Sequence, residues 1–463
     1  MCKTIVALLS IGVVLIWLFP PPHLAIYFGY PRRDGWDNLP VPKSLQRSWG
    51  AYTPFYPIEE YQPPPDDCKV TQPNMQLQRH GARYPTRGAS EGIQKAVHKL
   101  LSASEYREHT MFFLNNYKYE LGTDQLIKFG ADHARHTGAE MFYRYNSLIN
   151  KHHLPFVRAS GKQRVVDTAT NWTRGFAEAS RNVYQPKLDV ILSEKLNDTL
   201  DNTQCPNAGD ADFEVDEWVA IYGQPIAKRL NKAAPGANLT AADVYGLMLL
   251  CPFESQAKME KSSFCDLFTQ EEFGYLAYTS DLDKYYSTGY GQPLGRVQGV
   301  GYINELLARL TKTPVRDNTQ TNRTLDSSPD TFPLDRTVYA DFSHDNQMIA
   351  IYTAVGLFPQ YRALDPTTPD DKRSWMVSRM VPFSARMVTE KVECRIKEYV
   401  RIFVNDALQP LAFCGADEED GMCELNKFVK SQRYARHDGE GDWEACHAAT
   451  SVLPVLGHGI YGA

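Results

Sequence analysis

The feature that most constrains the fold of this 463-residue chain is a repeated pattern in which a strand runs into charged residues. Residues 69–78 are predicted to form a strand that ends at the string RHGAR. TVYADF, residues 337–342, has alternating apolar residues and predicts a strand that runs into SHD and then a helix. FVRA, residues 156–159, predicts another strand, and Ser160-Gly161 turns it into a helix. Strands that alternate with helices in this order predict an α/β domain around a mostly parallel sheet.

The chain divides into four predicted parts. Residues 1–19 are interpreted as a signal peptide or signal-anchor, and residues 20–66, rich in proline and aromatics, as an extended N-terminal segment. Residues 67–190 and 326–463 form the predicted α/β domain, which ends with a hairpin turning at Asn405-Asp406. Residues 191–325 mix helical patterns with polar loops and are interpreted as a mainly helical insertion.

The N-terminal apolar run TIVALLSIGVVLIWLF is short for a membrane-spanning helix and has the length of a secretory signal. Because no clear small-x-small cleavage motif follows it, a retained signal-anchor remains an alternative to a cleaved signal peptide. Either one directs the chain into the secretory pathway. The protein is therefore predicted to be secreted or tethered to a membrane by its N-terminus, with membrane contact only if the segment is retained. The sequence does not indicate an oligomeric state.

Cysteines and glycosylation motifs agree with export. Without Cys2 of the leader, eight cysteines remain, an even number that predicts a disulfide framework with 105 possible pairings. Four N-x-S/T motifs predict glycosylation at Asn171, Asn197, Asn238 and Asn322. The sequence contains neither CxxC nor HExxH, so no metal site is predicted. The pair His133/His136 has ligand spacing but is interpreted as a solvated helix face.

Charge indicates the kind of ligand. A net charge of -6 argues against nucleic acid as a partner, but locally concentrated positive charge could hold a small anion. In open α/β sheets, ligands bind beyond the C-terminal ends of the strands. The residues that would meet there are Arg79, His80, Arg83, Arg164 and His344. Because the arginine fork matches phosphate oxygens, the predicted partner is a small phosphate ester, with no cofactor.

Histidine adds chemistry to this binding. A neutral imidazole nitrogen can attack phosphorus and form a phosphohistidine. Phosphoryl transfer needs positioning and stabilised charge, which three arginines and a second histidine could supply without a metal. Asp345, beside His344, is a candidate acid for the leaving alcohol, and it would work best under acidic conditions. Arg158, inside the predicted strand VRAS, is assigned no role in the site and could be structural.

Longer strings resemble a known family. QRHGARYPT, VRASGKQRVV, QGVGYINELLARLT and TLDSSPDTFPLDRTVYADFSHDN, with others between residues 45 and 449, resemble the histidine acid phosphatases and among them the fungal phytases. The resemblance implies a phosphoglycerate-mutase-like α/β domain with a helical domain over the active site. It implies that His80 is the nucleophile, that Asp345 is the proton donor, and that the phosphate is held by Arg79, Arg83, Thr86, Arg164 and His344. It also implies the disulfides Cys68–Cys394, Cys205–Cys446, Cys251–Cys265 and Cys414–Cys423.

Departures from the family pattern concern the substrate surface. The segment after RHGARYPT contains Arg87 but no close lysine cluster. Where the family has adjacent lysines before a Tyr-Tyr pair, this chain has Asp283 and then Lys284. The family's Gln-Tyr pair near the N-terminus is Ala51-Tyr52 here. Tyr52 and Lys284 are still predicted to contact the substrate, although the positive surface around them is diluted.

The leading functional prediction is a phosphomonoesterase that hydrolyses inositol hexakisphosphate (phytate) through a phosphohistidine. The alternative is an acid phosphatase of broad specificity that acts on small phosphomonoesters, which the missing lysines favour. A non-catalytic phosphate-binding relative is a third class, and the presence of both His80 and Asp345 argues against it. A phosphomutase is a fourth, for which an exported, disulfide-bonded chain would be unusual.

Overall fold

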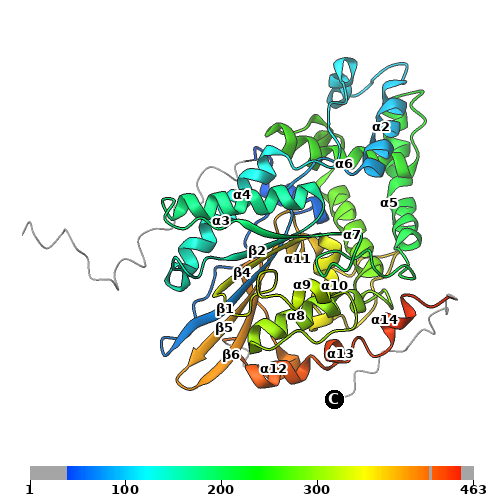
Figure 1. The fold of residues 1–463 in the computed structure, drawn as a ribbon. Helices are drawn as coiled ribbons and strands as arrows, with labels where there is room; N and C mark the ends of the chain where they lie inside the picture. Colours follow the sequence, from blue (N-terminus) through cyan, green and yellow to red (C-terminus); the bar gives the residue numbers. More distant parts are fainter. Residues whose placement is uncertain (1–38, 417–419, 450–463) are drawn as a thin grey trace, which may run out of the picture.

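The computed structural model describes residues 39–416 and 420–449, and its centre is one mixed eight-stranded sheet (Figure 1). The strand order is β3-β2-β4-β1-β5-β6-β7, with β8 beside β6. The first four strands are parallel, and the remaining strands extend the sheet with antiparallel pairs. The strands are β1 (Cys68–Arg79), β2 (Phe156–Ser160), β3 (Leu188–Leu192), β4 (Val338–Ser343), β5 (Arg386–Cys394), β6 (Lys397–Val404), β7 (Ala407–Leu408) and β8 (Cys423–Glu424).

The three strands predicted from strand-to-charge patterns are β1, β2 and β4, and they lie side by side in the parallel half. All six residues of β4 are buried, because it lies between two strands and both faces of the sheet are covered. The predicted alternation in TVYADF therefore understated its burial. The predicted hairpin forms between β6 and β7, and Asn405 and Asp406 at its turn have φ of 49° and 68°.

Helices cover both faces of the sheet. In Figure 1, α3 and α4 lie on one side of the strands and α8 and α10 on the other. The pair α3 and α4 packs closely because Gly138 and Gly175 have no side chain: a Cβ would meet the backbone of Trp172 and Arg135 respectively. The α-helices are α1 (Lys43–Gln46), α2 (Arg87–Leu101), α3 (Lys128–Tyr145), α4 (Gln163–Ala179), α5 (Asp212–Ala233), α6 (Ala241–Lys258), α7 (Gln270–Ser287), α8 (Val300–Thr311), α9 (Arg323–Asp326), α10 (Asp345–Val355), α11 (Val377–Met380), α12 (Leu425–Ser431), α13 (Arg433–Arg436) and α14 (Asp442–Ala445).

The 3-10 helices lie mostly in the connections between these elements. They are η1 (Gly50–Tyr52), η2 (His109–Asn116), η3 (Asn146–Leu148), η4 (Ser263–Leu267), η5 (Arg296–Gly299) and η6 (Ala412–Cys414). The longer helices α6 and α7 each begin with a capping box, in which Thr240 pairs with Asp243 and Thr269 with Glu272. Each box satisfies backbone N–H groups that the first turn leaves without partners, so it fixes where the helix begins.

Helices α5, α6 and α7 of the predicted insertion form a layer at one end of the sheet (Figure 1). The helix α2, from outside the insertion, packs against α6, whereas α8, from inside it, packs against α10 and β1. One hydrophobic cluster contains residues of both parts, such as Leu247 of α6 and Ile351 of α10. The helical layer and the sheet thus share a continuous core, and the domain boundaries at 190 and 326 stay a prediction.

Part of the predicted extended N-terminal segment, residues 39–55, is packed into the core, whereas residues 56–66 form no helix or strand and are half-buried or exposed. Residues 39–55 contain α1 and η1, and Trp49 is fully buried. Val41, Leu45 and Trp49 recur every four residues and are all buried, which is why the segment turns instead of extending. The predicted signal peptide or anchor at 1–19 lies outside the described residues. Within 39–416 and 420–449, we find no helix that combines the length and apolarity needed to cross a membrane.

Four disulfides stabilise the fold, and their pairs are those that the family resemblance implies. They join Cys68 to Cys394, Cys205 to Cys446, Cys251 to Cys265, and Cys414 to Cys423. The first joins neighbouring residues of β1 and β5, and the second links positions 241 residues apart. Cross-links between such distant positions restrict the unfolded chain, which is the main way a disulfide stabilises a fold.

Candidate active site

The strands bring the predicted charged strings together. In the β1/β4 pair, Arg79 lies opposite Ser343, so RHGAR and SHD emerge at the same edge of the sheet. The ring centroids of His80 and His344 lie 5.6 Å apart. β2 is the other neighbour of β4, and the turn after it leads into α4, which carries Arg164 in its first turn. The charged residues predicted to meet at the C-terminal ends of the parallel strands therefore lie together, and we call the region between them the crevice.

His80 lies at the centre of this crevice and is 1% exposed. Its Nδ1 lies 2.9 Å from the carbonyl oxygen of Gly81. A carbonyl oxygen can only accept, so Nδ1 carries the hydrogen and Nε2 keeps its lone pair. Burial, and then the positive charge of Arg164 and Arg79, hold the pKa of His80 well below its usual value. The imidazole is therefore neutral at mildly acidic pH and has a free nucleophilic nitrogen.

Arg79 is fully buried and held on several sides. Its Nη2 lies 2.9 Å from Asp345 Oδ2, and its Nη1 donates to the carbonyl of Val381 at 2.6 Å. Its guanidinium lies 4.7 Å from the ring centroid of Phe383, which also lies 6.0 Å from the His80 ring. Burial lowers the pKa of Arg79 to about 10, although Asp345 opposes the shift. The group remains positive at any pH at which an acid phosphatase would work.

The positive charges of Arg83 and Arg164 are only weakly compensated by carboxylates. Arg83 is 8% exposed, donates to the carbonyl of Tyr84 at 2.8 Å, and has no ion pair within the described part of the chain. Arg164 Nη1 lies 3.6 Å from Oδ1 of Asp124, a residue whose side chain is 45% exposed. Burial and then the charge of Arg83 lower the pKa of Arg164. This concentration of positive charge favours binding of an anion.

Asp345, the predicted proton donor, is paired with two cations. Its Oδ2 lies 2.9 Å from Arg79 and 3.2 Å from Nζ of Lys284 in α7. Burial would raise the pKa of Asp345, but Arg79 and Lys284 outweigh it and hold the pKa well below the usual value. Lys284 also contacts Asp283 at 2.9 Å and Asn346 at 2.6 Å. A phosphate that draws on Arg79 and adds negative charge beside Asp345 would raise that pKa again.

Tyr52 packs against Phe383 beside the cluster, and Thr86 follows Arg83 by three residues. The Tyr52 ring packs 4.8 Å from Phe253 and 6.2 Å from Phe383, and its backbone carbonyl accepts from Gln256 at 2.9 Å. Thr86 is the half-buried N-cap residue of α2, yet its hydroxyl forms no capping bond. Contact of either side chain with a substrate stays a prediction.

The sequence reasoning missed several residues of the site. Phe383, before β5, packs its ring against both Arg79 and His80. Glu194 and Asp201 follow β3, and their carboxylates lie 3.2 Å and 3.9 Å from Nε2 of His344. The sequence does not predict β3 or β5, so it gives no reason to assign Glu194, Asp201 or Phe383 to the site. The alternating string LDVIL before Ser193 and Glu194 was the available signal for β3.

Two histidine groups bear on metal binding. Within the described residues, one group of three potential ligands is found, Glu194, Asp201 and His344, whose ligand atoms lie within 4.8 Å of one another. The Glu194 carboxylate already accepts hydrogen bonds from protein donors, so the group carries no metal proposal here.

The interpretation of His133 as part of a solvated helix face was wrong: it is 2% exposed, and burial lowers its pKa to about 3. α3 turns this side chain inward, where its ring packs 4.2 Å from Phe129.

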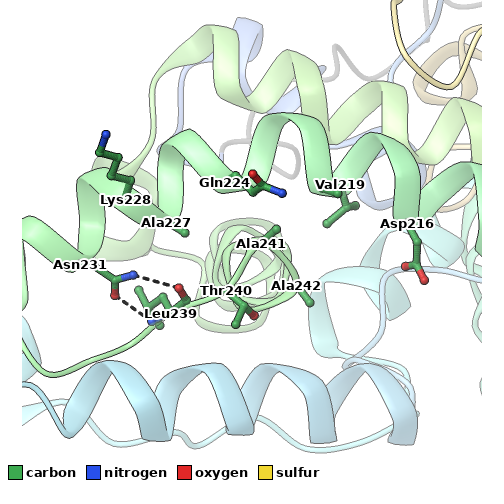
Figure 2. Close-up of a pocket in the computed structure, with 11 residues that line it drawn as sticks. Asp216, Val219, Gln224, Ala227, Lys228, Asn231, Leu239, Thr240, Ala241 and Ala242 are labelled. Atoms are coloured by element: carbon green, nitrogen blue, oxygen red, sulfur yellow. Dashed lines mark hydrogen bonds between the residues drawn. The ribbon is translucent and has the colours of Figure 1, made fainter.

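A separate hollow of about 760 Å³ lies between α5 and the start of α6 (Figure 2). Its lining includes Val219, Ala227 and Lys228, and Asn231 beside it is bound to the backbone of Leu239. None of the crevice residues lines this hollow, and no histidine does. We therefore place the candidate chemistry in the crevice, where the candidate nucleophile, acid and anion-binding groups converge.

The fold and this crevice define a class of α/β phosphatases that use a histidine after the first strand of the sheet. Residues 75–405 match the histidine phosphatase superfamily (branch 2), and the chain belongs to this superfamily. Phytase A of Emericella nidulans is 41% identical over an alignment covering 87% of this chain and 91% of that protein. Phytase A of Arthroderma benhamiae is 39% identical, with coverages of 87% and 92%.

Solved structures agree on the fold. The phytase from D. castellii superposes with a TM-score of 0.70 at 24% identity and covers 85% of each chain. The multiple inositol polyphosphate phosphatase of Bifidobacterium longum, in complex with inositol hexasulfate, has a TM-score of 0.60 at 13% identity and covers 82% of this chain and 96% of that one. The superfamily match and the Phytase A relatives confirm the resemblance to histidine acid phosphatases found in the sequence.

Proposed function

We propose that this protein is a metal-independent phytase, a phosphomonoesterase that releases phosphate from inositol phosphates through a phosphohistidine. The observation that carries the proposal is a neutral His80, with Nε2 free, surrounded by three arginines. Support comes from relatives named Phytase A along most of the chain and from a structural neighbour bound to inositol hexasulfate.

In the first step, Nε2 of His80 attacks phosphorus. The N–P bond forms while the bond from phosphorus to the ester oxygen breaks. Arg79, Arg83 and Arg164 stabilise the charge on the equatorial phosphate oxygens. Asp345, protonated once the substrate's negative charge lies beside it, gives its proton to the departing oxygen, so the product leaves as an alcohol.

In the second step, water attacks the phosphohistidine. The Asp345 carboxylate takes a proton from that water, the N–P bond breaks, and inorganic phosphate forms. His80 returns to its neutral state, and Asp345 again holds the proton that it gave away. The residues present can therefore complete both steps without a redox change or a co-substrate other than water.

Substrate choice depends on the rim of the crevice. We expect Lys284, Tyr52 and the exposed Arg87 to contact phosphates other than the one being cleaved. One observation favours the alternative of a broad-specificity acid phosphatase: Asp283 lies 2.9 Å from Lys284 and neutralises part of its charge. A simple monoester, which has a single phosphate, would be insensitive to this loss.

The test compares kcat/KM for phytate and for p-nitrophenyl phosphate on purified protein at mildly acidic pH. We expect a preference for phytate and a loss of at least about 10³-fold on both substrates in His80→Ala. His437→Ala, which changes an exposed histidine far along the chain, is the matched control and should keep full activity. A preference for the simple ester would favour the alternative, and turnover by His80→Ala would overturn the proposed nucleophile.

The role of Asp345 has its own test. Asp345→Asn should slow phytate hydrolysis by about 10²-fold or more, because an inositol alkoxide leaves poorly without a proton. It should slow p-nitrophenyl phosphate much less, because p-nitrophenolate is stable without one. Equal losses on both substrates would show that Asp345 acts by holding Arg79 instead of by proton donation.

We also infer that the protein is exported and glycosylated. Four disulfides favour an oxidising compartment, and the predicted leader would direct the chain there. Among the four motifs, Asn238 is exposed, whereas Asn171 is half-buried in α4 and its partner Thr173 is 8% exposed. Removal of N-glycans from the secreted protein should reduce its apparent mass, and unchanged mass in Asn238→Gln would argue against modification at that site.

A further inference from the structure

The carboxylate of Glu194 connects the residues around His344, and the two-step mechanism gives it no role. Its Oε1 lies 3.2 Å from Nε2 of His344 and accepts from the hydroxyl of Ser160 and the backbone N–H of Lys162, both at 2.9 Å. Its Oε2 lies 2.8 Å from Nζ of Lys162. Donors therefore reach both oxygens, so the carboxylate is fixed in position and stays ionised.

The hydroxyl of Ser160 shows which neighbouring acid carries a proton. It lies 2.9 Å from Glu194 Oε1 and also 2.9 Å from Oδ2 of Asp198. One hydroxyl hydrogen cannot serve two carboxylates, so one of the two acids must be protonated and donate to the hydroxyl. Asp198 is fully buried, and burial raises its pKa to about 7. Burial also opposes ionisation of Glu194, but hydrogen bonds from His344 and Lys162 outweigh it and lower that pKa to about 2.

The contacts of Glu194 involve the surroundings of two predicted phosphate ligands, Arg164 and His344. Lys162 is the N-cap residue of α4, and Arg164 follows it in the first turn. His344 is the N-cap residue of α10 and precedes Asp345. The Glu194 carboxylate thus contacts the N-cap residues of both α4 and α10, and both helices begin at the crevice.

The bond to Glu194 also limits what His344 can do. With the Nε2 hydrogen directed at Glu194, Nδ1 is the nitrogen left for an anion, and it donates only when the ring is doubly protonated. The charged and titratable groups around the ring are Glu194, Asp201 at 3.9 Å, and the His80 ring at 5.6 Å, with Lys162 behind Glu194. Glu194 thus determines which ring nitrogen of His344 remains available to a ligand.

We propose that Glu194 is a positioning residue for phosphate binding, which orients the His344 ring and fixes the turn that presents Arg164. The proposal rests on the proposed function, because it assumes that the crevice binds phosphate. It adds a residue to the site that touches no reacting atom and acts through the residues that do.

The test measures the inhibition constant of inorganic phosphate in four proteins: wild type, Glu194→Gln, His344→Asn and the double variant. Glu194→Gln keeps the size of the side chain and removes its charge. We expect it to weaken phosphate binding about tenfold in the wild-type background and less than about twofold in the His344→Asn background. In steady-state kinetics on p-nitrophenyl phosphate, KM should rise more than kcat falls. Equal losses in the two backgrounds would overturn the proposal.

Two further variants keep the test decisive. Glu178→Gln, in α4, removes the carboxylate of an exposed ion pair with Arg135 of α3 and should leave phosphate inhibition unchanged. If Glu194→Gln does not fold, Ser160→Ala removes one donor and leaves every charge in place, and it should weaken phosphate binding about threefold only when His344 is present. A wild type without phosphatase activity would overturn the proposed function, whereas an active wild type with no coupling to His344 would overturn only the role of Glu194.

Discussion

Two groups of buried arginines lie at the central sheet, and their carboxylate partners distinguish them. In β2, Arg158 is 1% exposed and contacts Asp341 at 2.8 Å and Glu305 at 2.6 Å. Arg309 adds a second contact to Asp341 at 2.6 Å. These four residues, which we call the sealed cluster, therefore contain two positive and two negative groups. In the crevice, Arg79 is the one arginine of its three with a carboxylate within 3 Å.

The pKa values move in opposite directions in the two groups. Burial would lower the pKa of Arg158, but Asp341 and Glu305 outweigh it and raise the pKa well above its usual value. Burial lowers the pKa of Arg79 and of Arg164, and their positive neighbours add to the shift. Burial alone therefore does not distinguish a structural arginine from a ligand-binding one. The two kinds of arginine differ in whether carboxylates of the protein compensate the charge. In the crevice, a bound anion supplies that compensation.

The largest effect should come from breaking the sealed cluster. Arg158→Met leaves Glu305 without its guanidinium partner and Asp341 with one partner instead of two. We expect the free energy of unfolding to fall by about 3–5 kcal/mol, because a buried carboxylate loses its counter-charge. Denaturant titration at neutral pH measures this loss. The folded fraction should retain its kcat on p-nitrophenyl phosphate, and a selective loss of kcat would place Arg158 in the active site.

Arg83→Met is the matched change in the crevice and should have the opposite profile. Phosphate loses one charged donor, so kcat/KM should fall by about 10²–10³-fold. The free energy of unfolding should stay the same or increase, because Arg83 has no ion pair within the described residues and its burial is costly. Kinetics and denaturant titration on the same preparation check both values. A stability loss as large as that of Arg158→Met would remove the distinction between the two groups.

The parts of the fold and site that the sequence could predict are those encoded locally. RHGAR and SHD each directly follow a predicted strand, so their meeting at one edge follows from parallel pairing. Arg158 could be assigned no function because it lies inside a strand, and the structure gives it a structural one. The disulfide pairs were available from family resemblance, since spacing left 105 combinations open.

The missed parts depend on contacts between distant segments. β5 pairs with β1 across more than 300 residues, and the charged residues of RMVTEKVEC hide its strand pattern even though most of its residues are buried. Phe383 joins the site because β5 is there, and Glu194 because β3 is there. Neither residue type marks a phosphate site by itself. Their roles arise from what they touch, which no local pattern contains.

A smaller effect should appear in the pH dependence of stability. Asp198 has a folded pKa of about 7, above the usual value of 3.8, so its ionisation favours the unfolded chain. Its contribution to stability is present below about pH 4 and is lost as the pH rises towards 7. A shift of this size corresponds to at most about 4 kcal/mol, and with local relaxation we expect about 2 kcal/mol.

Asp198→Asn imitates the protonated acid and should remove this slope. The amide can accept from the N–H of Leu200 and donate to Ser160, as the protonated carboxyl does. Thermal unfolding from pH 4 to 7 should show a smaller decline in stability in the variant than in the wild type. Parallel curves would show that Asp198 is already ionised at pH 4, and the proton assignment beside Glu194 would fail with it.

The smallest expected effect concerns Asp283, which separates a phytase rim from a general phosphatase rim. Its Oδ2 lies 2.9 Å from Lys284, and its side chain is 44% exposed. Asp283→Lys releases Lys284 and adds a positive charge, so KM for phytate should fall about three- to tenfold at low salt, with little change for p-nitrophenyl phosphate.

Glu271→Lys, an equal charge reversal on an exposed site of the same helix α7, controls for net charge. The selective effect should also shrink as ionic strength rises, because Asp283 and the added lysine lie at the partly exposed rim. If Glu271→Lys lowers KM for phytate as much, the gain comes from the overall charge of the protein. If neither variant discriminates between the substrates, the rim at Lys284 does not contact the outer phosphates, and the anion-binding charge is confined to the crevice arginines around the reacting phosphate.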